Sequence, residues 1–269
     1  MGLLDIAHLG HRIVERKLDA AAQAHAEQPA RADTGLPFGA RIGSLLELPG
    51  ADFALLEGSL LKAPAHPQLP VIAVSRMRFS ADRMLHVFRL YTDVGIERKG
   101  EGRSFLQVLV RGEEITDAAY YQHVLRVVPQ TPEEMEPFLG KGFGLGQSEF
   151  SLGRDLLEMS GRTPAQVTAL LGTEGDEIAL EYHRDTPTDA EYVAPYRSHE
   201  SRLDDAIGDK GQAAEVTSMD YARTLPSGET ERLLIALEFV SDKDGATEEA
   251  AHIDYLAGLP IAPARIKVI

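Results

Sequence analysis

Cysteine and tryptophan are both absent from this chain, and aromatic residues make up only 6% of it. Without cysteine, the chain has no disulfide bonds, zinc fingers, iron–sulfur clusters or thiol catalysis. A chain of 269 residues buries roughly 70–75% of the surface that its unfolded form exposes, so it needs no covalent cross-link to fold. The absence of cysteine suits a reducing compartment, and we expect a cytoplasmic protein.

Long apolar runs and positive charge are also scarce. No stretch approaches the ~18 consecutive apolar residues of a membrane-spanning helix, and the N-terminal segment lacks the apolar core and cleavage site of a secretory signal. We therefore expect neither a transmembrane segment nor export. Lys and Arg number 27 against 42 Asp and Glu, which gives a formal net charge of −15. A surface of that sign repels phosphate backbones, so nucleic acid is not an expected partner.

The N-terminal segment has apolar residues at helical spacing: Leu3, Ile6, Leu9, Ile13, Val14 and Leu18. This pattern predicts an amphipathic helix over about residues 3–26, followed by a linker rich in proline, glycine and polar residues. Such a helix docks on a protein or on a membrane surface. Its acidic residues offset its basic ones, which favours protein docking. We therefore divide the chain into residues 1–34 and a β-rich globular domain, 35–269.

The globular domain has strand-like patterns on both sides of a helical centre. Apolar and polar residues alternate from residue 41 onward and again after residue 173, which indicates β-strands. Between them, "TPEEMEPFLG" and "TPAQVTALLG" each begin with a threonine N-cap and a proline. Glu134 and Gln166 complete capping boxes with these threonines, and Gly172 stands at a C-cap position, so we predict two short helices. This order predicts an α+β fold, a mostly antiparallel β-sheet with the N-terminal amphipathic helix and short central helices. It leaves room for two subdomains, 35–130 and 173–269.

A predicted β-hairpin carries the first candidate site. "SADR", residues 80–83, joins two strand-like runs as a four-residue loop, and counting outward from it pairs Met77 with His86 on the core-facing side. Four polar side chains then share the outward face: Arg76, Arg78, Arg89 and Tyr91. Guanidinium groups on an acidic protein predict a site for a phosphate, a carboxylate or an acidic partner. Alternatively, these groups are solvated or paired with the protein's own carboxylates.

The second candidate site is a metal site on a predicted strand. "EYHRD" places Glu181, His183 and Asp185 at alternate positions, which puts them on one face of that strand. A His-x-Asp pair with a distant second histidine is the ligand set of a ferrous site, and His199 and His252 are the candidates for the second imidazole. Alternatively, the three residues simply occupy the solvent-facing side of the strand.

Five segments in order, "RLYTD", "SFLQVLV", "SMDYARTL", "ERLLIALEF" and "DYLAGLPI", carry a family resemblance. Through them the chain resembles the YjfK-like family of uncharacterised bacterial proteins over most of its length after the linker. The resemblance implies no reaction and no catalytic residues. Members tend to be encoded beside a protein like the phage-shock coiled-coil protein of the inner membrane and beside an ATP-grasp ligase related to glutathionylspermidine synthase. That neighbourhood implies a role in envelope maintenance.

Two functional hypotheses follow from these observations. The first is a non-enzymatic cytoplasmic protein without a cofactor that binds a protein partner. The resemblance implies that this partner is a phage-shock-like coiled-coil protein at the inner membrane. The second is a metal-dependent enzyme or small-ligand-binding protein that uses the Glu-x-His-x-Asp strand.

Overall fold

The structure is a computed structural model that describes residues 30–92, 104–172, 178–243 and 250–269. The chain divides into two compact units, Met1–Ala32 and Asp33–Ile269. The expected amphipathic helix over residues 3–26 lies outside the described residues. The fold and the sites below belong to the unit that begins at Asp33.

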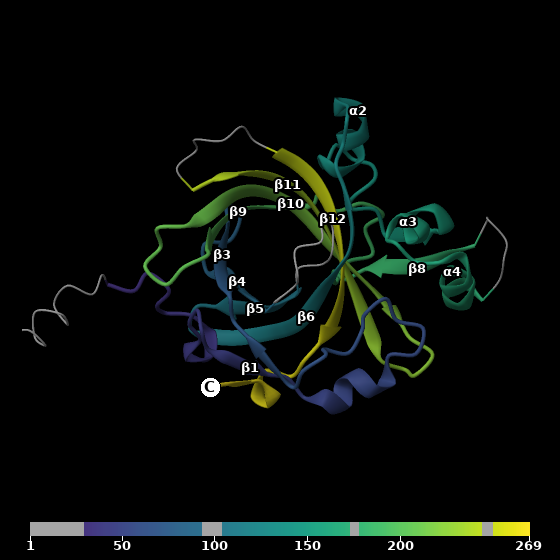
Figure 1. The fold of residues 1–269 in the computed structure, drawn as a ribbon. Coiled ribbons are helices and arrows are strands. Elements are labelled where there is room, and N and C mark those ends of the chain that lie inside the picture. Colours follow the sequence, from purple (N-terminus) through teal and green to yellow (C-terminus); the bar gives the residue numbers. More distant parts are fainter. Residues whose placement is uncertain (1–29, 93–103, 173–177, 244–249) are drawn as a thin grey trace, which may run out of the picture. The chain divides into compact units, whose positions relative to one another are not determined.

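Eight strands of this unit close into an antiparallel β-barrel (Figure 1). Four of them form a meander in the first half of the chain: β3 (Ala73–Phe79), β4 (Leu85–Tyr91), β5 (Ser104–Arg111) and β6 (Glu114–Val127). Four more form a second meander: β9 (Tyr196–Leu203), β10 (Gly211–Thr224), β11 (Thr230–Asp242) and β12 (Ala250–Pro260). The two meanders join where β3 pairs with β9 and β6 pairs with β12.

The predicted fold class was wrong. The part of the chain that the structure describes is mostly β, with 47% of its residues in strands and 15% in helices, and forms an antiparallel barrel in place of the expected α+β fold. Alternation identifies strands one at a time and carries no signal that their outer edges will meet. Because closure leaves no unpaired edge in the ring, the barrel satisfies backbone groups that an open sheet exposes. The ranges 35–130 and 173–269 therefore contribute their strands to one barrel.

Short elements pack on the outside of the barrel wall. β7 (Glu149–Gly153) and β8 (Ala179–Arg184) extend the sheet from β10, and α2 (Pro132–Met135), α3 (Arg154–Met159) and α4 (Pro164–Leu171) lie between the two meanders in sequence. Figure 1 shows α3 and α4 beside β8. The predicted capping box of α4 is confirmed, since the Thr163 side chain and Gln166 cap each other. None of the helices in the described ranges is long and apolar enough to cross a lipid bilayer.

A second small sheet and four 3-10 turns complete the unit. β1 (Leu45–Glu47) pairs with β2 (Gln68–Pro70) and with β13 (Lys267–Val268). The turns are η1 (Pro37–Gly39), η2 (Gly50–Leu55), η3 (Glu136–Phe138) and η4 (Pro263–Arg265). Apolar residues of these elements join the outward side chains of the barrel strands in the largest hydrophobic core. The outer wall is therefore the main source of apolar burial.

A buried carboxylate fixes the segment after η2 to the barrel. Glu231 of β11 is fully buried and accepts hydrogen bonds from Tyr182 Oη at 2.6 Å and from the Leu60 backbone N–H at 2.6 Å. Arg223 forms an ion pair with it at 2.7 Å, and the Ser59 hydroxyl donates a further bond. Removing a fully bonded buried carboxylate leaves several donors unsatisfied, so this group is structural.

The inner wall of the barrel is rich in charged groups. Tyr121 on β6 donates a hydrogen bond of 3.0 Å to Asp220 on β10, and Arg89 on β4 lies 3.6 Å from Glu238 on β11. Neither pair comes from neighbouring strands, so both contacts cross the interior. The interior therefore combines two small apolar clusters with a polar network.

Candidate functional site

The hairpin of β3 and β4 has a different register from the predicted one. Met77 pairs with Val87 and Ser75 with Arg89, one position away from the predicted pairing of Met77 with His86. The connection has one residue more than expected, because the Asp82 carboxylate accepts a hydrogen bond of 2.9 Å from the Met84 backbone N–H and holds that residue in the loop. A slip of one residue turns all side chains of one strand to the other face.

The slip separates the four residues of the first candidate site. Arg89 and Tyr91 point into the barrel, whereas Arg76 and Arg78 lie on the outer wall, where Arg76 is opposite Phe88. The prediction that the four share one face was therefore wrong. Arg89 is only 2% exposed.

Glu200 of β9 is the centre of the polar network around Arg89. It accepts a hydrogen bond of 2.9 Å from Arg89 and one of 2.8 Å from the Tyr91 hydroxyl. The Ser75 hydroxyl donates a third. Arg89 Nε also donates to Gln107 Oε1 at 3.1 Å. Every one of these side chains is buried, so the group has exchanged its bonds with water for bonds within the protein.

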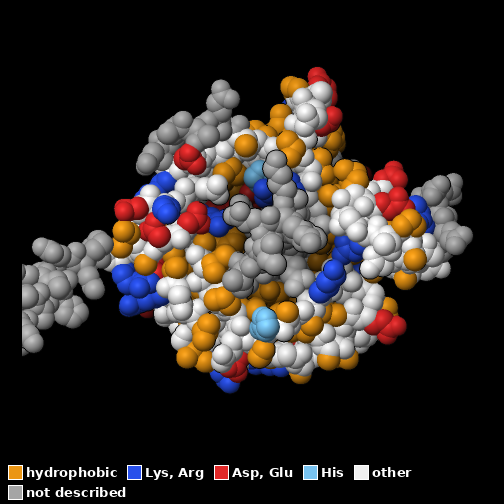
Figure 2. Space-filling model, in the orientation of Figure 1, with side chains coloured by type: hydrophobic (Ala, Val, Ile, Leu, Met, Phe, Trp, Pro, Cys, Tyr) orange, Lys and Arg blue, Asp and Glu red, His pale blue; other side chains and the backbone are white. Residues whose placement is uncertain are grey.

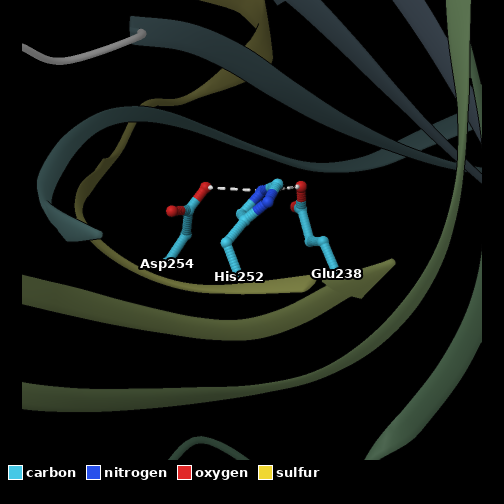
Figure 3. Close-up of side chains that lie close together, drawn as sticks. All are labelled: Glu238, His252 and Asp254. Carbon is cyan, nitrogen blue, oxygen red and sulfur yellow. Dashed lines mark hydrogen bonds and ion pairs between the residues drawn. The ribbon is translucent and has the colours of Figure 1, made fainter. Parts of the chain in front are cut away.

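Glu238, His252 and Asp254 form the second part of the interior network (Figure 3). His252 Nε2 lies 3.1 Å from Glu238 Oε2 and 3.6 Å from Asp254 Oδ2. Arg126 donates two hydrogen bonds to the Asp254 carboxylate, at 2.7 and 2.5 Å, and His123 Nε2 lies 3.1 Å from the same group. Figure 3 shows the imidazole between the two carboxylates. We call Glu238, His252 and Asp254 the barrel triad.

The environment keeps the carboxylates of the barrel triad ionised. Burial raises the pKa of Asp254. The hydrogen bonds from Arg126 and His123 lower it by more than burial raises it, so the pKa lies well below its ordinary value. Burial also raises the pKa of Glu238, and the hydrogen bond with His252 and the charge of Arg89 more than offset it, so this pKa is lowered as well. For Arg89, burial lowers the pKa, whereas Glu200, Tyr91 and Glu238 raise it above the ordinary value.

The interior also contains a small cavity. Its volume is about 20 Å³, and its lining includes Glu200, Glu238, Tyr91 and Arg202. Arg202 stacks on the Tyr91 ring, with 4.4 Å from its Cζ to the ring centroid, and pairs with Asp204 at 2.7 Å. A cavity of this size holds about one water molecule. It therefore has no room for an organic substrate.

Tyr121 and Asp220 belong to a separate polar group in the barrel. Burial raises the pKa of Asp220, and the charge of Asp185 raises it further, while the Tyr121 hydrogen bond and Arg232 oppose the change. Arg232 is bonded to Asp117 and lies 3.6 Å from Asp185. Asp220 is thus a half-buried carboxylate whose charge is only partly compensated.

The predicted metal-site residues on β8 do not converge on one point. Glu181 and His183 are exposed, and Glu181 accepts a hydrogen bond of 2.7 Å from Ser151. His183 lies 3.7 Å from Glu149. Asp185 follows the strand and faces Arg232. Among the described residues, the histidine and carboxylates that do come together are those of the barrel triad, whose ligand atoms all lie within 4.8 Å of one another.

The barrel triad contains one of the two histidines considered for the second imidazole. His252 and Asp254 repeat the His-x-Asp spacing of His183 and Asp185, and His252 and Asp254 lie on one face of β12, whereas Asp185 follows the end of β8. His199, the other candidate, lies on the outer wall, 3.1 Å from Glu215. The sequence signal was therefore present twice, and only the closed barrel distinguishes the buried pair from the exposed one.

The outer wall carries a basic group of its own. Arg78 is exposed and lies directly opposite His86 on β4 and His199 on β9. Arg76 stacks over the Phe88 ring, with 5.1 Å from its Cζ to the centroid. Neither arginine forms an ion pair with any residue that the structure describes. We call Arg76, Arg78, His86 and His199 the arginine face.

Comparisons with protein-family models, with curated proteins and with solved structures found no match to this chain. The resemblance to the YjfK-like family therefore stays a prediction.

Proposed function

We propose that this protein is a non-enzymatic binding protein that holds an acidic protein partner on its arginine face. The observation that supports the proposal is that Arg76 and Arg78 form no ion pair with any residue in the described part of the chain, although the chain has 42 acidic residues. Guanidinium groups left free on a rigid strand are available to carboxylates of another molecule.

The local geometry supports an extended acidic segment as the bound element. Side chains two positions apart on one strand face lie roughly 7 Å apart, which is also the spacing of alternate side chains in an extended peptide. Two alternate Glu or Asp residues of the partner can therefore meet Arg76 and Arg78 at once. The stacking on Phe88 holds the Arg76 guanidinium in place, so less side-chain entropy is lost on binding.

The charge of the whole chain also limits how the partner binds. On the side shown in Figure 2, acidic and basic side chains are interspersed, so the net charge of −15 is not gathered into one repulsive patch there. Attraction to the two arginines acts over about a Debye length of 8–10 Å at physiological salt. Binding should therefore weaken as salt is added.

The resemblance to the YjfK-like family supplies one candidate partner. A phage-shock-like coiled-coil protein at the inner membrane, implied by that resemblance, would place this protein at the cytoplasmic face of the envelope. This candidate belongs to the proposal and is tested with it.

The test compares two double variants with the same change of charge. Arg76→Ala plus Arg78→Ala removes the arginine face, whereas Arg111→Ala plus Arg265→Ala removes arginines that are already paired with Asp82 and Asp52. The probe is fluorescent poly-L-glutamate, followed by anisotropy at low salt, and the candidate coiled-coil protein is tested alongside it. We expect at least about tenfold weaker binding for the first variant, or about 1.4 kcal/mol, and little change for the second. Equal weakening in both variants, or no binding by the wild type, would overturn the proposal.

A further inference from the structure

We propose that the barrel triad, Glu238, His252 and Asp254, binds one divalent metal ion inside the barrel. This site lies on the inner wall and is separate from the arginine face. It contains none of Glu181, His183 and Asp185, although it includes His252, one of the two histidines considered as the second imidazole of that predicted site.

The spacing of the ligand atoms fits a metal ion. All three atoms lie within 4.8 Å of one another, and His252 Nε2 is 3.1 and 3.6 Å from the two carboxylate oxygens. Metal–ligand bonds of about 2.0–2.2 Å place adjacent ligand atoms about 3–3.6 Å apart. Glu238 and His252 are directly opposite each other on β11 and β12, so paired strands hold the ligands at this spacing.

The charge of the surrounding network also favours a cation. The network around the triad contains three carboxylates, those of Glu200, Glu238 and Asp254, and two guanidinium groups, those of Arg89 and Arg126. One negative charge is therefore in excess at a buried place. The His252 ring has a single nitrogen, Nε2, facing Glu238 and Asp254, and one N–H forms a straight hydrogen bond with only one of these carboxylates. A metal ion between the three groups satisfies both carboxylates.

The groups around the triad resemble the supports of known metal ligands. Carboxylates that bind metals usually also accept hydrogen bonds from outer residues, which fix their orientation. Arg126 and His123 do this for Asp254, and Arg89 lies close to Glu238. Each carboxylate oxygen has two lone pairs, so Asp254 can keep these bonds and still bind a metal.

The ligand types indicate which ions the site would take. One imidazole and two carboxylates suit borderline and hard divalent ions such as Fe²⁺, Mn²⁺ and Zn²⁺. The cavity of about 20 Å³ beside Glu238 has room for one water molecule as a further ligand.

The experiment uses the full chain, purified without a histidine tag and freed of metal with a chelator. Calorimetric titration with Mn²⁺ and with Zn²⁺ should give about one equivalent of binding, and either ion should raise the melting temperature by linkage. Glu238→Gln and His252→Ala should each weaken binding at least tenfold. The matched control is His183→Ala, which changes the exposed His-x-Asp pair and should bind the metal as the wild type does.

Three results would overturn the inference. The first is a folded wild type that binds no ion and shows no metal-dependent melting temperature, which would leave the triad as an ion-paired group only. The second is loss of binding in His183→Ala with binding retained in His252→Ala, which would place the metal on β8. The third is binding unchanged in Glu238→Gln. If His252→Ala does not fold, the wild-type titration and Glu238→Gln still decide, and none of these results depends on the arginine face.

Discussion

Arg89 on β4 and Glu200 on β9 form an ion pair of 2.9 Å inside the barrel, across the intervening strand β3. Their side chains are 3% and 6% exposed, so neither charge can turn to water if the other is removed. We therefore expect Glu200→Ala to lower the free energy of unfolding by about 3–5 kcal/mol, since it leaves a buried guanidinium without its main partner. Urea denaturation followed by circular dichroism measures this loss.

The control for this prediction is the exposed ion pair of Arg111 and Asp82, whose side chains are 60% and 34% exposed. Asp82→Ala also removes a loop hydrogen bond, so the better control variant is Arg111→Ala, with an expected cost below about 1 kcal/mol. A similar, small cost for Glu200→Ala would show that water enters the barrel and solvates Arg89.

The sequence predicted the two strands of the hairpin that contains Arg89, β3 and β4, but not the register in which they pair. Alternation of apolar and polar residues in β3 and β4 fits either of two pairings that differ by one residue. The choice depends on the loop, where the Asp82 side chain bonds to the Met84 backbone. A count of loop residues from the sequence does not reveal that bond, and the error moved Arg76 and Arg78 to the opposite face from Arg89 and Tyr91.

The interior site was missed for a related reason. A strand that faces water and a strand that faces a polar barrel interior have the same alternating pattern, so Glu200 and Glu238 look like surface residues in the sequence. Only closure of the ring shows that they are buried. Local signals were more reliable, as the capping box at Thr163 and the left-handed Gly172 at the end of α4 show.

Asp220 should make stability depend on pH in an unusual direction. Its folded-state pKa is raised from the ordinary 3.8, mainly by burial. The folded protein therefore binds this proton more tightly than the unfolded chain, and the resulting stabilisation is present below the unfolded pKa and lost as the pH rises through the folded pKa. Asp220→Asn stays neutral and still accepts the Tyr121 hydrogen bond. Its stability relative to the wild type should therefore increase as the pH rises from the ordinary 3.8 through the folded-state pKa, by about 1.4 kcal/mol for each pKa unit of the shift.

Asp205 is the control, because its contribution to stability should depend on pH in the opposite direction. Its desolvation raises the pKa, but four backbone N–H groups, from Lys210, Asp209, Gly208 and Ile207, bond to the carboxylate and lower it overall. Its contribution is present above the unfolded pKa and lost as the pH falls. Asp205→Asn should therefore lose stability relative to the wild type as the pH rises from the folded-state pKa of Asp205 to the unfolded value near 3.8. Parallel pH trends for the two variants would contradict the assignment for Asp220.

Residues 1–32 should be dispensable for folding of the barrel unit. Asp33 is only 1% exposed and accepts a hydrogen bond of 2.8 Å from the Ile42 backbone N–H. We therefore expect Asp33 to be the first residue that the barrel unit requires for stability. We expect deletion of residues 1–32 to change the melting temperature by less than about 2 °C, which corresponds to under about 1 kcal/mol for a unit of this size.

A longer deletion tests where that boundary lies. Removing residues 1–40 also removes Asp33, Pro37 and Ala40, all of which are buried. This variant should melt at least about 4 °C lower than the shorter deletion. If the shorter deletion already prevents cooperative unfolding, the barrel unit does not fold without its N-terminal neighbour.

Gly258 on β12 should tolerate a side chain poorly. It pairs with Tyr121 on β6, and a Cβ atom at this position would meet Cδ1 of the Tyr121 ring at 2.6 Å. That separation is far below van der Waals contact, and the ring is held by its hydrogen bond to Asp220. Gly258→Ala should therefore cost about 1–3 kcal/mol through overpacking, measured by urea denaturation.

A double-mutant cycle separates this clash from the backbone effect of replacing a glycine. In a Tyr121→Ala background the ring is gone, so adding the methyl group at Gly258 should cost little or should fill part of the cavity. Gly50→Ala, where a Cβ atom has no neighbour within 4 Å, should change stability by less than about 0.5 kcal/mol. If Gly258→Ala cost the same with and without the tyrosine ring, the cost would come from the backbone, and the contact between β12 and β6 would not limit the residue at this position.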